Sequence, residues 1–173
     1  MRGLKEIMLV DGYNIINGWP KLKETAQHSL DDARGQLIDI LENFQGYNKI
    51  NIILVFDAHM IRGGQEKIEF VGQLQVVYTK ENETADHYIE RWTDGIEKNM
   101  HVIVASSDAL QQTIILGRGA VRMSARELLN LVEKTQREMD HRFLKRQEAK
   151  NNALEGWADA ETIRVLDSWR KQR

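Results

Sequence analysis

Apolar residues along this chain follow two alternating patterns. Short runs rich in β-branched residues cover residues 7–10, 50–56, 74–78 and 101–105, with a weaker run at 120–123. Such runs are typical of strands that are buried on both faces. Between them, apolar residues recur with a helical period in residues 29–43, 84–98, about 108–116 and from 124 onward. Strands that alternate with helices predict an α/β fold, with a mostly parallel central sheet flanked by helices on both faces.

Capping residues mark where two of these helices begin. Ser29 with Asp32, and Ser124 with Glu127, have the spacing of N-terminal capping pairs. The single proline, Pro20, lies between the first run and the first helical pattern, in a segment that we expect to be a loop. The helix over residues 84–98 is expected to bury one apolar stripe, which consists of Ala85, Ile89, Trp92 and Ile96.

The last quarter of the chain differs from the rest in charge. Residues 1–133 contain 14 basic and 19 acidic residues, a net charge of −5, whereas residues 134–173 contain 10 basic and 7 acidic residues, a net charge of +3. A final, separate amphipathic helix is expected over residues 159–170, after two adjacent asparagines. We therefore expect one domain over residues 1–133 and a basic helical C-terminal extension over residues 134–173. The extension would meet phosphate groups or a partner, although a solvated helix surface explains its charge equally well.

The composition restricts the kinds of site that the chain can build. At 173 residues, 42% apolar and 29% charged, it is a globular chain with one substantial core. It has no cysteine, so a metal would be bound by oxygen or imidazole ligands, which favours hard ions such as Mg²⁺ or Mn²⁺. The N-terminal apolar stretch is too short for a signal peptide, and about 18 consecutive apolar residues occur nowhere. We expect a cytoplasmic protein without a membrane partner.

Four aspartates lie at or near the carboxyl ends of the expected strands. Asp11, Asp57 and Asp108 come at the ends of the first, second and fourth runs, and Asp86 begins the helix after the third run. Ligands of open α/β sheets bind outside the carboxyl ends of the strands, so these carboxylates are expected to converge at one edge. Each except Asp11 also has an ordinary structural explanation, which is helix capping for Asp108, the helix dipole for Asp86 and a turn for Asp57.

A group of carboxylates in one cleft requires raised pKa values or a bound cation. Mg²⁺ or Mn²⁺, held by a few carboxylates and waters, would activate water for hydrolysis of a phosphodiester. Asn14 is expected to orient a carboxylate or a water, and Ser106 and Ser107 to hydrogen-bond the metal ligands. Glu81 and Glu83 are expected to be exposed to solvent.

Other aspartate and phosphate chemistries lack their motifs. Asp11 is followed by Gly12 and Tyr13, so the Asp-x-Asp motif of haloacid-dehalogenase phosphatases is missing. No Walker motif or dinucleotide-binding glycine motif stands between a strand and a helix. A phosphoacceptor receiver domain would need an acidic pair after the first strand and a lysine after the last, and neither is present.

Five segments, in this order, resemble the YacP-like NYN domain family: LVDGYNII, VFDAH, TKENETADHYIER, ASSD and GAVRMSARELL. The resemblance covers about residues 7–133. It implies a PIN-like nuclease fold and a metal-dependent endoribonuclease, similar to ribosome-associated enzymes that initiate messenger RNA decay in bacteria. It also implies that Asp11, Asp86 and Asp108 are catalytic and bind Mg²⁺ or Mn²⁺, and that Asn14 is the asparagine of the first motif. Asp57 is expected to support this site.

An RNA or ribosome partner would present phosphates to basic side chains. The residues expected to contact it are Arg62, Lys80, Arg126, Lys134, Arg137, Arg142, Lys145 and Arg146. Tyr13, Trp19 and Tyr88 would stack on bases if they are exposed, but aromatic residues near strand ends more often belong to the core.

Two other functions remain open at this point. The first is a non-catalytic RNA- or ribosome-binding adaptor that keeps the PIN-like fold and uses the basic extension. The second is a phosphatase or a flap-type DNA nuclease with the same metals. Deleting the extension would abolish the function of an adaptor but leave a nuclease some metal-dependent activity, and substrate competition would reveal the second alternative.

Overall fold

The computed structural model describes residues 5–57, 64–97, 100–107 and 119–170. The chain divides into two compact units, Met1–Glu133 and Lys134–Arg173. The predicted α/β class is confirmed, because the first unit combines a mostly parallel sheet with helices. The helix predicted at about residues 108–116 lies outside the described residues.

The described part of the first unit contains a six-stranded sheet in the order β3-β4-β2-β1-β5-β6. Every neighbouring pair is parallel except β3 with β4. The apolar runs in the sequence are therefore the parallel strands. The bounds are β1 Lys5–Asp11, β2 Asn51–Phe56, β3 Lys67–Val71, β4 Leu74–Tyr78, β5 Met100–Ala105 and β6 Val121–Met123.

One strand, β3, was missed by the sequence pattern. In the described part of the sheet it is an edge strand beside β4, and the turn that joins the two strands contains Gly72, which has a φ of +58°. Because an edge strand buries little side-chain surface, it needs no continuous apolar run, and Phe70 is 68% exposed. Its residues alternate between charged and apolar types and so escape the criterion for buried strands.

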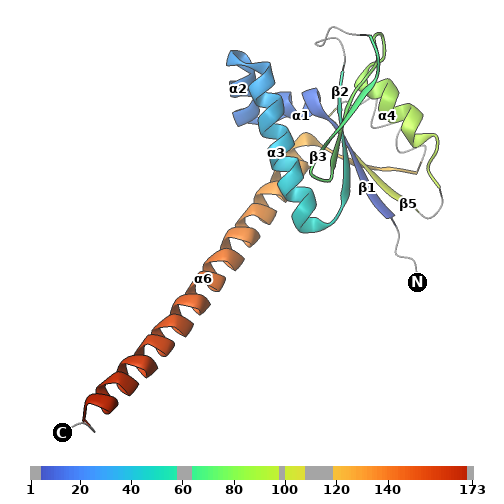
Figure 1. Cartoon of the computed structure of the whole chain (residues 1–173). Helices are drawn as coiled ribbons and strands as arrows, with labels where there is room; N and C mark the ends of the chain where they lie inside the picture. The colour runs from blue at the N-terminus through green and yellow to red at the C-terminus, as the bar shows by residue number, and fades with distance from the viewer. Residues whose placement is uncertain (1–4, 58–63, 98–99, 108–118, 171–173) are drawn as a thin grey trace. The chain divides into compact units, whose positions relative to one another are not determined.

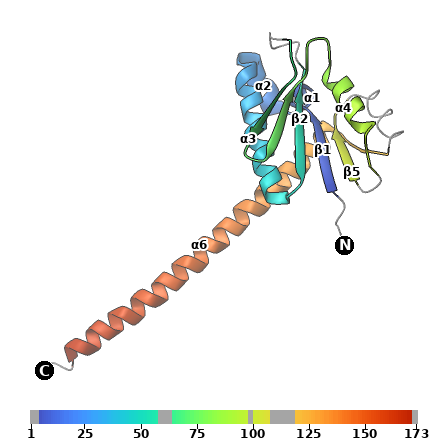
Figure 2. The same cartoon turned by 45° about the vertical axis from the view of Figure 1, so that its right-hand side comes forward.

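Helices cover both faces of the sheet, as predicted (Figures 1 and 2). Met8, Leu54 and Phe56 point to one face, where they pack against α1, α2, α3 and the start of α6. Leu9, Val55 and Val77 point to the other face, against α4. This alternation explains why the central strands contain continuous apolar runs, such as residues 7–10 of β1 and 52–56 of β2. The helices are α1 Gly12–Gly18, α2 Pro20–His28, α3 Leu30–Asn48, α4 Ala85–Thr93 and α6 Ala125–Arg170.

The predicted caps are confirmed, but several helix bounds differ. Ser29 accepts a hydrogen bond from the Asp32 amide, and Ser124 and Glu127 form a reciprocal capping box. The expected loop at Pro20 is wrong, because this residue begins α2, where a proline needs no amide donor and its fixed φ suits a helix. α3 runs five residues beyond the predicted end, and α4 ends five residues before it.

The C-terminal region forms one helix and not the two that we expected. α6 continues through Asn151 and Asn152 to Arg170, because asparagine lowers helix stability by well under 1 kcal/mol and does not remove a backbone donor. All residues from Asp140 to Ala153 are exposed. No helix within the described ranges is long and apolar enough to cross a membrane.

Candidate active site

Asp11 is the last residue of β1 and also the N-cap of α1. Its carboxylate accepts a hydrogen bond from the Asn14 amide at 3.3 Å, and the residue is only 9% exposed. The following glycine is required by packing, because a Cβ atom on Gly12 would lie 2.3 Å from the ring of Phe56. The start of α1 therefore lies directly on the end of β2, and this contact fixes the position of the Asp11 carboxylate.

A second carboxylate, that of Asp86, lies beside Asp11. The pKa of Asp11 is raised to about 7, chiefly by burial, and the charge and hydrogen bond of Asp86 contribute to this value while the Asn14 amide opposes it. The charge of Asp57 acts in the same direction. The two predicted catalytic aspartates thus meet at one edge of the sheet, and Asp57 lies close enough for its charge to affect the pKa of Asp11. We call Asp11, Asp57 and Asp86 the acidic edge.

Asp86 is placed by the connection from β4 to α4. The Thr79 amide donates to the Phe56 carbonyl at 3.0 Å, which ties the end of β4 to the end of β2. The Thr79 hydroxyl donates to the Glu83 carbonyl at 2.5 Å, and Thr84 caps α4 by accepting from the amide of His87 at 3.2 Å. Asp86 therefore begins the helix from a closed, hydrogen-bonded turn.

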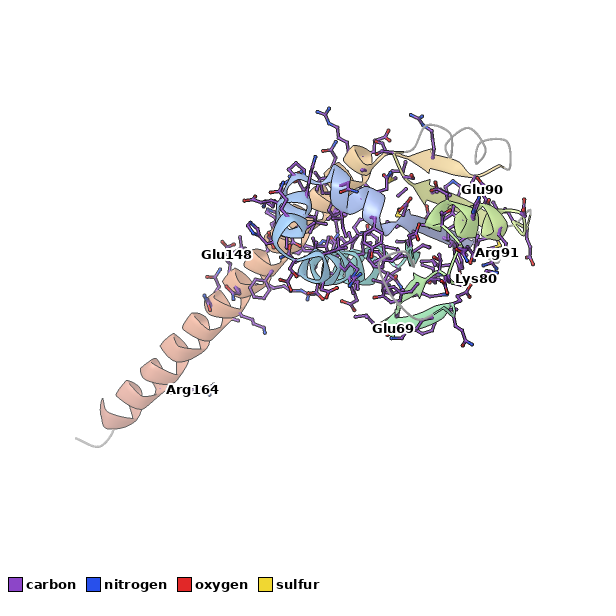
Figure 3. All side chains as sticks on the ribbon, turned by 90° about the horizontal axis from the view of Figure 1, so that it is seen from above. Glu69, Lys80, Glu90, Arg91, Glu148 and Arg164 are labelled. Atoms are coloured by element: carbon purple, nitrogen blue, oxygen red, sulfur yellow. The ribbon has the colours of Figure 1, made fainter. Side chains whose placement is uncertain are left out.

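Glu83 is buried, contrary to the expectation that it would be exposed. It is 7% exposed, and its Oε1 accepts from the Arg91 Nε at 3.1 Å and from its terminal nitrogen at 2.9 Å. Arg91, on α4 (Figure 3), also binds Glu66 at 3.2 Å and lies over the ring of Tyr88. The Oε2 of Glu83 has no partner among the described residues. Sequence reasoning missed this pair, because Glu83 lies before α4 and its spacing from Arg91 is not that of a helical ion pair.

Asn14 and Ser107 join three segments near Asp11. The Asn14 side-chain oxygen accepts from the Ser107 amide at 2.7 Å, after β5. The Ser107 hydroxyl accepts from the Ala125 amide at 3.0 Å, and the Trp19 indole donates to the Ala125 carbonyl at 2.8 Å. These bonds hold α1 against the end of β5 and the start of α6. Ser106, also expected to support the site, is buried, and its amide donates to the Met123 carbonyl at 2.9 Å.

Two predicted site residues, Asp108 and Arg62, lie outside the described residues. Within the described ranges, no three histidine or acidic side chains lie close enough together to hold a metal ion. Among these residues, the acidic edge consists of the close pair Asp11 and Asp86, with the charge of Asp57 nearby. Its oxygen ligands, the burial of Asp11 and the mutual repulsion of the pair fit a hard divalent cation, which would be completed by other oxygen ligands.

Of the three aromatic residues that we considered for base stacking, two are core residues. Trp19 is 3% exposed and Tyr88 is 6% exposed, so neither can stack on a base. Tyr13 is only half-buried. Its hydroxyl accepts from Arg34 at 2.9 Å, and its ring contacts Phe56 with centroids 5.1 Å apart. Arg34 was not found from the sequence, because nothing local connects α3 to Tyr13.

The predicted basic contacts that the structure describes are all exposed, which leaves them accessible to a phosphate. They are Lys80, Arg126, Lys134, Arg137, Arg142, Lys145 and Arg146. Lys80 lies two residues after the end of β4, on the connection that leads to Asp86. Five of the seven belong to the second unit.

The mostly parallel α/β sheet, with carboxylates at the carboxyl ends of its strands, is the architecture expected of a nuclease-type NYN domain. The model of the YacP-like NYN domain matches residues 8–171, and the chain belongs to this family. The resemblance seen in the sequence is thus confirmed, and the match extends past residue 133 to the end of α6.

Solved and curated relatives agree with this assignment. The chain is 38% identical over 167 residues to the uncharacterized protein YacP of Bacillus subtilis (strain 168), covering 96% of this chain and 97% of that protein. It is similar to the crystal structure of Rae1 (YacP) from Bacillus subtilis, with 38% identity, a TM-score of 0.73 and coverage of 95% and 94%. A mutant of the same protein gives 40% identity, a TM-score of 0.71 and coverage of 81% and 82%.

Proposed function

We propose that this protein is a metal-dependent endoribonuclease that cleaves messenger RNA in association with the ribosome. The observation that carries the proposal is the Asp11–Asp86 pair. A carboxyl group with a pKa raised to about 7, beside a second carboxylate at the carboxyl end of a parallel sheet, is destabilising for the fold and is characteristic of functional sites. Membership of a nuclease-type family supports the reaction class.

Asp11, Asp86 and Asp108 would hold Mg²⁺ or Mn²⁺. When bound, such an ion supplies an activated water and stabilises the charge on the leaving oxygen. Asp11 and Asp86 would neutralise the charge of the ion, which in turn would relieve their mutual repulsion. The Asn14 amide keeps the Asp11 carboxylate oriented, while its side chain holds the Ser107 backbone. Asp57 contributes negative charge from the end of β2.

The basic extension, residues 134–173, would serve as the phosphate-binding part of a two-part molecule. Its exposed lysines and arginines suit the backbone of RNA, which such residues bind without reading sequence. With an overall charge of −2, the whole chain is poorly suited to strong binding of free RNA. Delivery by a ribosome in the cytoplasm would supply the substrate at high local concentration.

Cleavage of a long messenger RNA tests this function. We expect wild-type protein with Mn²⁺ to cut the RNA, and Asp11→Asn to leave it intact, because asparagine keeps the cap to Asn14 but removes the charge that binds the ion. Reactions with and without translating ribosomes measure whether the partner is required. Equal cleavage by both proteins would refute the proposal, and no cleavage under any condition would favour a non-catalytic adaptor.

A further inference from the structure

Three aromatic rings form a row across the carboxyl ends of β1, β2 and β4. Tyr13 lies 5.1 Å from Phe56 with the rings tilted by 56°, and Phe56 lies 5.7 Å from Tyr78 with the rings nearly parallel. Phe56 is completely buried, whereas the two tyrosines are half-buried. The central ring therefore supports two outer rings that keep part of their surface accessible.

Arg34 reaches this row from α3. Its side chain is 15% exposed, and its guanidinium donates to the Tyr13 hydroxyl and pairs with Asp31, whose side chain is 80% exposed. Burial raises the pKa of Tyr78, with a smaller contribution from Glu69, and the charge of Arg34 opposes both. The guanidinium thus acts on both outer rings.

The ion pair with Asp31 does not account for this placement. Exposed ion pairs contribute little to stability, whereas holding an arginine stem against the protein costs side-chain entropy. The pair lies within the first two turns of one helix, so it needs no contact with Tyr13. A guanidinium held by a tyrosine hydroxyl and by an exchangeable, exposed carboxylate is positioned to bind another anion.

The row and the acidic edge meet at the carboxyl ends of β1 and β2, where Gly12, packed on the Phe56 ring, links Asp11 to Tyr13. The row lies on the face of the sheet that α3 covers, whereas Asp86 comes from α4 on the opposite face. Glu69, on β3 (Figure 3), is paired with Lys67, so the negative charge near Tyr78 is compensated. An RNA strand that passes over the carboxyl ends of β1 and β2 would therefore have the acidic edge on one side and two partly exposed rings with a cation on the other.

We propose that Arg34, Tyr13 and Tyr78 form a subsite for one nucleotide of single-stranded RNA next to the acidic edge. The guanidinium binds the phosphate in place of Asp31, since its planar fork matches phosphate oxygens. One of the tyrosine rings stacks on the base, which gives affinity without strong sequence preference. The subsite rests on the proposed function, because it takes RNA as the substrate.

Binding of a fluorescent single-stranded RNA tests the subsite, with full-length Asp11→Asn protein as the uncleaving parent. Adding Arg34→Gln should weaken binding about tenfold and reduce the slope of log affinity against log salt by about 0.7, the value for one phosphate contact on a single strand. Adding Asp31→Asn should tighten binding about threefold, because the guanidinium loses its competitor. If Arg34 had only a structural role, Arg34→Gln and Asp31→Asn would not change RNA affinity in opposite directions.

Matched controls come from exposed charges on neighbouring helical surface. Lys23→Gln on α2 and Asp39→Asn on α3 remove the same charges elsewhere, and each should change affinity less than about twofold. If Arg34→Gln fails to fold, Arg34→Lys keeps the charge but loses the fork and should still weaken binding about threefold. Circular dichroism establishes that each variant is folded.

The outcomes separate the subsite from the nuclease. If wild-type protein cleaves RNA but Arg34→Gln behaves like Lys23→Gln and Asp31→Asn fails to tighten binding, the subsite is refuted and the nuclease stands. If wild-type protein does not cleave but Arg34 and Asp31 act in opposite directions, the nuclease is refuted and the subsite stands. A parent protein that binds no RNA refutes the subsite.

Discussion

The acidic edge and the basic part of α6 differ in whether their charged groups are buried or exposed to solvent. Asp11 is buried, accepts a backbone hydrogen bond and lies beside Asp86, at a site where a pKa of about 7 costs roughly 4 kcal/mol at neutral pH. Lys145 and Arg146 are fully exposed on one helix, which costs almost nothing. A costly arrangement needs a function that depends on its geometry. We therefore assign chemistry to the acidic edge and affinity to the basic helix.

The largest effect is expected from Asp86→Asn. Removing one charge of the pair should lower the rate of RNA cleavage with Mn²⁺ by on the order of 1,000-fold, because the ion loses a ligand. Glu81→Gln is the matched control, an exposed acid in the same connection, and should retain full activity. Initial rates on a single-stranded RNA measure both, and equal losses in the two variants would show that position is irrelevant.

Stability of the metal-free protein should depend on pH through Asp11. Its folded pKa, about 7, is above the unfolded value of 3.8, so the unfolded state ionises first and stability falls as the pH rises from about 4 to 7. Asp11→Asn should remove this dependence and raise the free energy of unfolding by up to about 4 kcal/mol at pH 8, with a smaller gain at pH 5. Urea denaturation at several values of pH, with a chelator present to keep the protein metal-free, measures the free energy of unfolding. An equal gain at both values of pH would contradict the assigned pKa.

Arg91→Ala tests the support beneath Asp86. It should lower the free energy of unfolding by about 1–3 kcal/mol, because the buried Glu83 carboxylate loses its partner. Adding Glu83→Gln to it should recover part of the loss. Lys23→Ala, at an exposed helical position, should change stability by less than about 0.5 kcal/mol. Identical losses in the single and double variants would mean that the pair is not coupled.

The smallest effect is expected on the basic helix. Replacing Lys145 and Arg146 together by glutamine should weaken RNA or ribosome binding a few-fold and leave kcat unchanged, since on the proposed function these residues would contact phosphates and not the reacting atoms. Glu148→Gln, on the same exposed stretch (Figure 3), should not weaken binding. A fall in kcat would place chemistry on the basic helix and overturn the comparison.

Local patterns predicted most of the fold. The central parallel strands were visible because both of their faces are buried, and two helix starts were visible because a cap needs only three or four residues. β3 was missed because an edge strand buries few side chains. α1 and α2 were missed because their 7 and 9 residues are too few to show a clear helical period, and Leu22 is the one buried residue of α2. The unbroken α6 was missed because two asparagines are too weak a signal for a helix end.

The meeting of Asp11 with Asp86 was predictable, because parallel topology alone brings strand ends together. The environment of Glu83 and the contact of Arg34 with Tyr13 were not, because both depend on side chains that meet only after folding. Arg34 and Tyr13 are 21 residues apart, on different helices. Sequence reasoning thus finds residues at the ends of elements more readily than residues that pack between them.

Binding of Mn²⁺ to the folded protein, followed by electron paramagnetic resonance, tests the central claim without relying on activity. We expect wild-type protein to bind Mn²⁺ at the acidic edge, and both Asp11→Asn and Asp86→Asn to bind it at least about tenfold more weakly. Glu81→Gln should bind like the wild type. Equal Mn²⁺ affinity in the wild type and both aspartate variants would contradict the assignment of these two residues to a metal site.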